Sequence, residues 1–248
     1  MCVIIVASAA AQSGIRPPQL GFAGSADSTL RPVYGVAGNF ILGPPVQEKV
    51  ISEAFSGSLG LLKTESALEV FGNQGQVLAA MDAVAGPALF AFSLDSLTAL
   101  AYIPGSNTLV EWKAGQLVAQ LVNMPFRPEL GTVLAIALPN ALEASLIVQR
   151  EDGIWEVGSG SQKALVGVTA PLLVLASGRL LYHDARGIVL RNSDNSEVHI
   201  AAQLPGKFSL QQMDSNWVQL SDLATARRFA IRVIPGREGF YELPESRP

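Results

Sequence analysis

Charged side chains in four short turns are the groups in this sequence best suited to bind a polar ligand. The turns carry Arg127 with Glu129, Glu151 with Asp152, Asp184 with Arg186, and Arg237 with Glu238. Guanidinium and carboxylate groups form charge-assisted hydrogen bonds to peptides, glycans and small polar molecules. We therefore predict a binding site made of Arg127, Glu129, Asp152, Asp184, Arg186, Arg237 and Glu238. The alternative is a solvated surface on which these charges form only local ion pairs.

The other reactive residues form no catalytic or metal-binding pattern. The two histidines, His183 and His199, lack the His-x-x-x-His spacing of a metal site. Neither a G-x-S-x-G nucleophile motif nor a phosphate-binding loop occurs, and Cys2 is the single cysteine. Residues 192–197 (NSDNSE) lack the central glycine and distal glutamate of a calcium loop, so we predict a hairpin turn there. We accordingly expect no catalytic residue, no metal and no cofactor.

Composition favours one soluble domain with a full core. Of the 248 residues, 49% are hydrophobic and only 15% are charged, and the formal net charge is -4. Such a charge provides no basic field for phosphates, which argues against nucleic-acid binding. The longest apolar stretches are either too short to cross a bilayer or are interrupted, for example by Pro139, Asn140 and Glu143. We therefore expect no membrane span.

The N-terminal residues suggest export. The stretch MCVIIVASAAAQSG runs from apolar residues into three alanines, so residues 1–11 are interpreted as a signal-peptide remnant. An apolar N-terminal strand is the alternative. Residues 12–29 are rich in Gly, Pro and Ser and are predicted to form an extended arm. We expect the protein to be periplasmic or extracellular and monomeric.

Short apolar segments alternating with turn signals predict an all-β fold. Within this series a motif of a small residue, a large apolar residue and a mixed run recurs. Its copies are ALEVF (67–71), TLVEW (108–112), GIWEV (153–157), GIVLR (187–191) and GFYEL (239–243). The spacings of 41, 45, 34 and 52 residues lie near the length of a β-propeller blade. Each of the first four copies has two apolar segments before it and one after it, which predicts four-stranded antiparallel units.

Over residues 30–244 the chain resembles the β-propeller superfamily through these degenerate repeats, although it has none of the signature motifs of the named repeat families. The resemblance implies a single domain of five four-stranded antiparallel blades. It also implies that an N-terminal strand, LRPVYGV (30–36), closes the last blade by pairing with GFYEL. Six blades or a β-sandwich are the alternatives.

The functional expectation is a non-enzymatic binding or scaffold module. Loops on one face of the ring would recognise a protein, a glycan or a small polar ligand. The alternative, which the resemblance brings with it, is a glycosidase-like hydrolase with carboxylates at the central mouth. Aromatic residues are only 7% of the chain, which gives few platforms for sugar rings.

Overall fold

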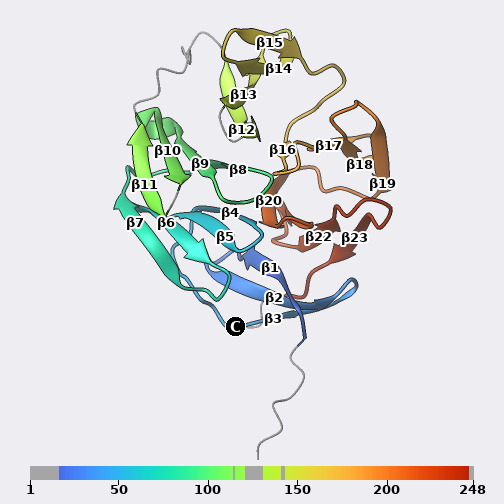
Figure 1. Ribbon diagram of the computed structural model, residues 1–248. Helices are drawn as coiled ribbons and strands as arrows, with labels where there is room; N and C mark the ends of the chain where they lie inside the picture. The colour runs from blue at the N-terminus through green and yellow to red at the C-terminus, as the bar shows by residue number, and fades with distance from the viewer. Residues whose placement is uncertain (1–16, 114, 121–130, 141–142, 246–248) are drawn as a thin grey trace, which may run out of the picture.

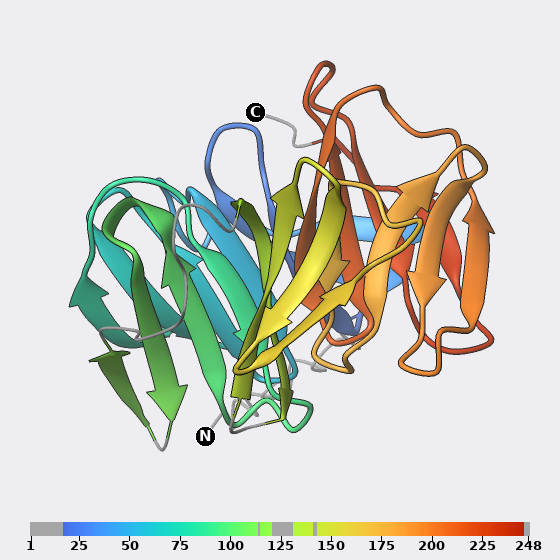
Figure 2. The ribbon, with the colours of Figure 1, turned by 90° about the horizontal axis from the view of Figure 1, so that it is seen from above.

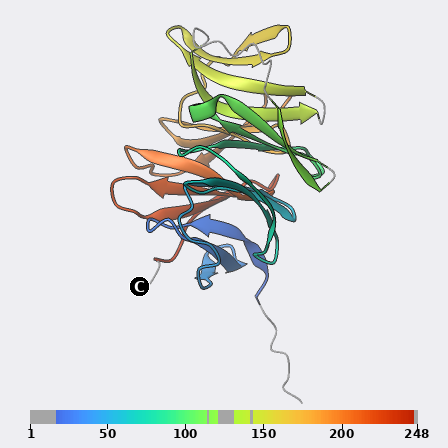
Figure 3. The ribbon, with the colours of Figure 1, turned by 90° about the vertical axis from the view of Figure 1, so that its left-hand side faces the viewer.

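Six antiparallel sheets are arranged like blades around a centre (Figure 1), and the all-β propeller prediction is confirmed. The computed structural model describes residues 17–113, 115–120, 131–140 and 143–245. The views in Figures 2 and 3 show strands that run across the thickness of the ring. The number of blades is six, the alternative to the five that the repeats favour.

The blades follow one another along the chain. Blade 1 has three strands, β1 (Gln19–Gly24), β2 (Leu30–Val36) and β3 (Asn39–Leu42). Blade 2 has β4 (Ser52–Ser56), β5 (Leu59–Lys63), β6 (Ala67–Gly72) and β7 (Val77–Asp82). Blade 3 has β8 (Leu89–Phe92), β9 (Ala99–Ile103), β10 (Thr108–Lys113) and β11 (Gln116–Gln120), with a 3-10 turn at Pro104–Ser106.

The other three blades are also four-stranded. Blade 4 has β12 (Thr132–Asn140), β13 (Glu143–Arg150), β14 (Gly153–Gly158) and β15 (Ser161–Ala164). Blade 5 has β16 (Leu173–Val174), β17 (Leu180–Asp184), β18 (Gly187–Arg191) and β19 (Glu197–Ala201). Blade 6 has β20 (Phe208–Asp214), β21 (Trp217–Asp222), β22 (Arg228–Arg232) and β23 (Gly239–Glu242).

Packing between blades explains why the strands are apolar on both faces. Every residue of β5 and of β9 is buried. The core divides into six hydrophobic clusters, and each cluster joins the facing sides of two neighbouring blades. Because blade 1 packs against blade 6 on one side and blade 2 on the other, six seams close the ring by side-chain burial.

The expected strand exchange between the chain ends does not occur. LRPVYGV is β2 and pairs with β1 and β3, whereas GFYEL contains β23, which among the described strands pairs only with β22. The first four motif copies are third strands, but GFYEL is a fourth strand, because RFAIRV, which contains β22, precedes it. The predicted extended arm includes β1, whose Phe22 and Ala23 are buried. The possible signal-peptide remnant lies outside the described residues.

The innermost described strand of blade 1, β1, runs antiparallel to the innermost strands of blades 2 and 6, which are β4 and β20. A Cβ added to Gly21 would lie 2.1 Å from the Met213 carbonyl oxygen near the end of β20. A Cβ added to Gly24 would lie 2.2 Å from Glu53 Oε1 near the start of β4. In a regular propeller the first strands of all blades run in the same direction. Because β1 runs against β4 and β20, the strands β1, β2 and β3 correspond to the second, third and fourth strands of a regular blade. The described part of blade 1 lacks a first strand, and β4 and β20 are in contact beside it.

Two faces of the ring follow from this topology. We call the end at which β4 and β20 begin the start face, and the end at which they finish the end face. Turns between second and third strands lie on the start face, and turns between first and second strands lie on the end face.

In the described part of the chain, no helix has the length and apolar character needed to cross a membrane.

Three serine hydroxyls connect the blades at the end face. Ser56 Oγ lies 2.9 Å from Ser96 Oγ and 3.2 Å from Ser215 Oγ, and Ser215 Oγ accepts a 2.9 Å hydrogen bond from the Gly57 N–H. These contacts join blades 2, 3 and 6 at the ends of their first strands, and Ser56 is fully buried. These hydrogen bonds hold together the turns that follow the first strands of blades 2, 3 and 6. Blade 1, whose described part has three strands, lies between blades 2 and 6.

Replacing Ser56 by alanine should lower the free energy of unfolding by about 1–2 kcal/mol, because its two hydroxyl partners lose a hydrogen bond. Urea denaturation followed by circular dichroism measures the loss. Ser58→Ala, an exposed change two residues away, is the control and should have little effect. Equal stability of wild type and Ser56→Ala would show that the hydroxyl cluster does not hold the blades.

Candidate functional site

The structure places Asp152, Asp184 and Arg186 on the start face. Asp152 lies in the turn between β13 and β14, and the other two lie at the end of β17 and in the following turn. Both turns connect a second strand to a third. Arg127 and Glu129 lie outside the described residues.

Arg237 and Glu238 are on the opposite face, which corrects the prediction. They lie in the turn between β22 and β23, which connects a third strand to a fourth. Glu238 Oε1 forms a largely buried ion pair, 3.7 Å long, with Arg179 Nη2 from the first turn of blade 5. The error arises because GFYEL is a fourth strand, so the turn before it belongs to the end face.

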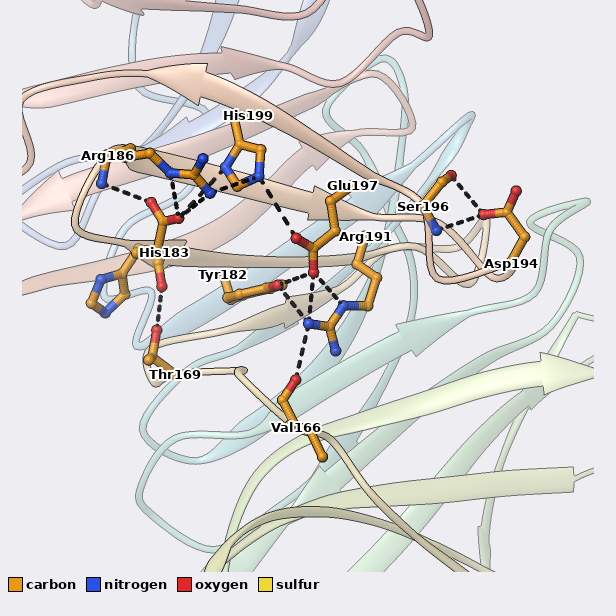
Figure 4. Close-up of polar contacts among 11 residues, drawn as sticks. Val166, Thr169, Tyr182, His183, Arg186, Arg191, Asp194, Ser196, Glu197 and His199 are labelled. Atoms are coloured by element: carbon orange, nitrogen blue, oxygen red, sulfur yellow. Dashed lines mark hydrogen bonds and ion pairs between the residues drawn. The ribbon is translucent and has the colours of Figure 1, made fainter.

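Asp184 belongs to a polar network on blade 5, in which its partners Arg186 and His199 are labelled in Figure 4. Its Oδ1 accepts a 2.8 Å hydrogen bond from the Arg186 N–H, and its Oδ2 forms a 2.9 Å ion pair with Arg186 Nη2. His199 from β19, the outer strand of the same blade, lies 3.5 Å from the same oxygen through Nδ1. The Arg186 N–H hydrogen bond, with further help from the Arg186 guanidinium and His199, lowers the pKa of Asp184. Asp184 is therefore an ionised acceptor at the start face.

A second part of the network braces blade 5. The Tyr182 hydroxyl donates a 2.7 Å hydrogen bond to Glu197 Oε1, which also forms a 2.7 Å ion pair with Arg191 Nη2 (Figure 4). Arg191 Nη2 also donates to the carbonyl oxygen of Val166, 3.0 Å away in the connection that leads to blade 5. Burial, helped by the bond to Glu197, raises the pKa of Tyr182 to about 12. Tyr182 thus stays protonated, and this part of the network holds the connection that leads to blade 5.

Asp152 interacts within its own blade. Its Oδ1 accepts a 2.9 Å hydrogen bond from Trp155 Nε1, and the guanidinium carbon of Arg150 lies 5.1 Å from the centre of the Trp155 ring. Asp152 and Asp184 therefore belong to separate clusters, and Glu238 is at the other end of the ring. These carboxylates do not form the facing pair that the hydrolase alternative requires.

A groove beside Asp184 is one concave part of this face. It has a volume of about 660 Å³, and we call it the start-face groove. Its lining includes Asp184, Lys207, Pro171, Leu204, Phe208 and Leu223. The groove thus combines one acidic and one basic side chain with an apolar wall. The sequence prediction missed Lys207 and Leu223. Leu223 is a large apolar residue in a polar turn, and this could have indicated a binding surface.

Residues 192–197 form the expected hairpin turn. Asp194 Oδ1 accepts hydrogen bonds from the N–H and the hydroxyl of Ser196, at 2.9 and 2.6 Å (Figure 4), and Asn195 has a positive φ of 66°. The carboxylate is used to hold the turn. Within the described ranges no group of three or more His, Cys, Asp or Glu side chains is arranged to hold a metal ion.

Comparison with known proteins shows the fold of the chain. No protein-family model and no curated protein matches it. A chain of the nidogen/laminin complex is similar with a TM-score of 0.54 and 14% identity, over 92% of this chain and 99% of that one. A Bacteroides caccae protein of unknown function has a TM-score of 0.51 and 14% identity, over 92% and 100%. TolB from Acinetobacter baumannii has a TM-score of 0.50 and 12% identity, over 91% and 66%. The chain is a β-propeller, and at such identities the likeness extends to the fold alone.

Proposed function

We propose that this β-propeller is a non-enzymatic binding module that recognises a segment of a partner protein in the start-face groove. The observation that carries the proposal is the pairing of Asp184 and Lys207 with an apolar wall in one concave surface. A peptide that lies in the groove could place a basic side chain by Asp184, an acidic one by Lys207 and apolar ones between them.

Two further features support a protein partner. The groove is built from turns on a rigid ring, and such turns commonly carry recognition in scaffold folds. A structurally similar chain takes part in the nidogen/laminin complex, which is an assembly of proteins. We also propose that the module acts in the periplasm or outside the cell, and the apolar N-terminal stretch supports this location.

To test this proposal, a partner protein is first captured by crosslinking to the purified chain and identified. The partner is then purified, and its binding to the chain is measured. We expect Asp184→Ala and Lys207→Glu each to weaken its binding roughly tenfold or more, because each removes a charge from the groove. Surface plasmon resonance measures the two affinities.

Matched changes outside the groove provide the controls. Asp194→Ala removes an exposed turn carboxylate from the end face of the same blade, and Lys163→Glu reverses an exposed charge on the outer strand of blade 4. Both should bind as wild type does. Normal binding by the two groove variants, or weaker binding by the control variants, would contradict the proposal.

A further inference from the structure

A second concave site lies where the ring closes. A pocket of about 480 Å³ at the start face is lined by the turn after β1, the start of β4 and the start-face ends of blade 6. We call it the seam pocket. It lies beside β1, in the sector where the described part of blade 1 lacks a first strand. It is distinct from the start-face groove, although Leu223 lines both.

Two buried oxygens in residues of this pocket have no hydrogen-bond partner in the protein. They are Glu53 Oε1 and Gln219 Oε1, in side chains that are 6% and 2% exposed. The Gln219 amide is oriented by its Nε2, which donates a 3.0 Å hydrogen bond to the Gly24 carbonyl oxygen and a 2.7 Å bond to Ser221 Oγ. Such oxygens are costly to bury unless a donor satisfies them.

The charged groups around Glu53 are of both signs. Arg228 and Asp222 line the pocket from blade 6, and Asp27 and Arg31 on blade 1 act electrostatically on Arg228. Arg228 Nη1 donates to the Gly24 carbonyl oxygen at 3.1 Å and to Ser25 Oγ at 2.8 Å, which fixes the guanidinium against the turn after β1. The pocket therefore has no large net charge of either sign.

We propose that the seam pocket binds a small molecule through a primary ammonium group, which donates hydrogen bonds to Glu53 Oε1 and Gln219 Oε1. The two unsatisfied groups are both acceptors, and an ammonium carries three donors and no acceptor. Its charge also neutralises the buried carboxylate when that carboxylate ionises. This inference does not depend on the partner proposed for the start-face groove.

The ligand selectivity of the wild-type protein is the first test. n-Propylamine, 1-propanol and tetramethylammonium are titrated separately into the purified chain, and amide shifts of the turn after β1 are followed by NMR. We expect propylammonium to bind at least tenfold more tightly than 1-propanol, which lacks the charge, and tetramethylammonium, which lacks N–H donors. Binding should tighten between pH 6 and pH 8, since burial raises the pKa of Glu53 to about 7. Equal binding of 1-propanol, or no binding of the amine at any pH, would overturn the proposal.

Variants locate the site. Glu53→Gln should weaken propylammonium binding by roughly tenfold to a hundredfold, and Gln219→Leu should weaken it as well. If one of the two variants does not fold, the other still tests the site. Glu69→Gln is the matched control, because Glu69 also lies in blade 2 with an unpartnered oxygen but does not line the pocket. Undiminished binding by Glu53→Gln and Gln219→Leu would place the amine elsewhere. Asp184→Ala, which tests the groove, should leave amine binding unchanged.

Discussion

Replacing Phe22 by alanine is expected to lower the free energy of unfolding by about 3–5 kcal/mol, the usual cost of deleting a buried phenylalanine. Phe22 is 4% exposed and belongs to the cluster that joins blade 1 to blade 2. Its ring stacks on Phe55 with centroids 4.7 Å apart and meets the edge of Phe71 at 6.0 Å. This seam is one of the two by which blade 1 packs into the ring, and the other joins blade 1 to blade 6. Chemical denaturation measures the loss.

The seam also predicts how the variant unfolds. A ring weakened at this position exposes the facing sides of blades 1 and 2, so Phe22→Ala should bind a hydrophobic dye before the other blades unfold. Phe240→Ala is the control, because Phe240 lies on the outer strand β23, is only partly buried and stacks on Phe229 at 4.8 Å. It should cost clearly less. A smaller loss for Phe22→Ala than for Phe240→Ala would show that this seam contributes less to stability than the outer strand of blade 6 does.

The sequence was sufficient to predict the propeller because each blade repeats the same pattern. The first four motif copies are the third strands of blades 2 to 5, and the polar turns around them are where the pattern predicts them. Burial of both sheet faces accounts for strands that are apolar throughout rather than alternating. These are local features, and local features survive in a degenerate repeat.

The number of blades depended on one irregular spacing. The interval from Ile188 to Phe240 is 52 residues, longer than the other three, whereas Phe229 in β22 lies 41 residues after Ile188. RFAIRV is therefore the true fifth copy, and GFYEL follows it as a fourth strand. Blade 1 was missed because its described part has three strands and it contains no copy of the motif. The position of Arg237 and Glu238 on the wrong face follows from the same shift.

The seam pocket could not be read from the sequence. Glu53 lies near the start of an apolar strand, and its sequence position resembles that of an exposed residue at a strand end. Its burial results from Gly24, which approaches its carboxylate because it has no side chain, and the pocket is completed by Gln219 and Arg228 from the last blade. Groups so far apart in sequence meet only through ring closure. By contrast, Asp184 and Arg186 could be placed on one face because a single turn holds both.

Glu53→Gln should stabilise the protein at pH 8 and leave its stability at pH 4 nearly unchanged. Desolvation raises the pKa of Glu53 from 4.5 to about 7, although the backbone N–H of Gly24 acts in the opposite direction. Below pH 4.5 the carboxyl is protonated in the folded and unfolded states alike. Between pH 4.5 and 7 the unfolded state releases the proton while the folded state retains it, so the free energy of unfolding falls as the pH rises.

The size of the effect follows from the shift. A change from 4.5 to about 7 corresponds to a loss of roughly 3 kcal/mol above pH 7, at 1.36 kcal/mol for each pKa unit. Glutamine cannot ionise, so the variant avoids this loss. The measurement is the difference in unfolding free energy between wild type and variant from pH 4 to pH 8, which cancels the titration of all other groups. Ser58→Ala, an exposed change that involves no titratable group, should give a difference that does not vary with pH. A flat difference for Glu53→Gln, or a variant less stable than wild type at pH 8, would show that the folded protein already satisfies an ionised Glu53.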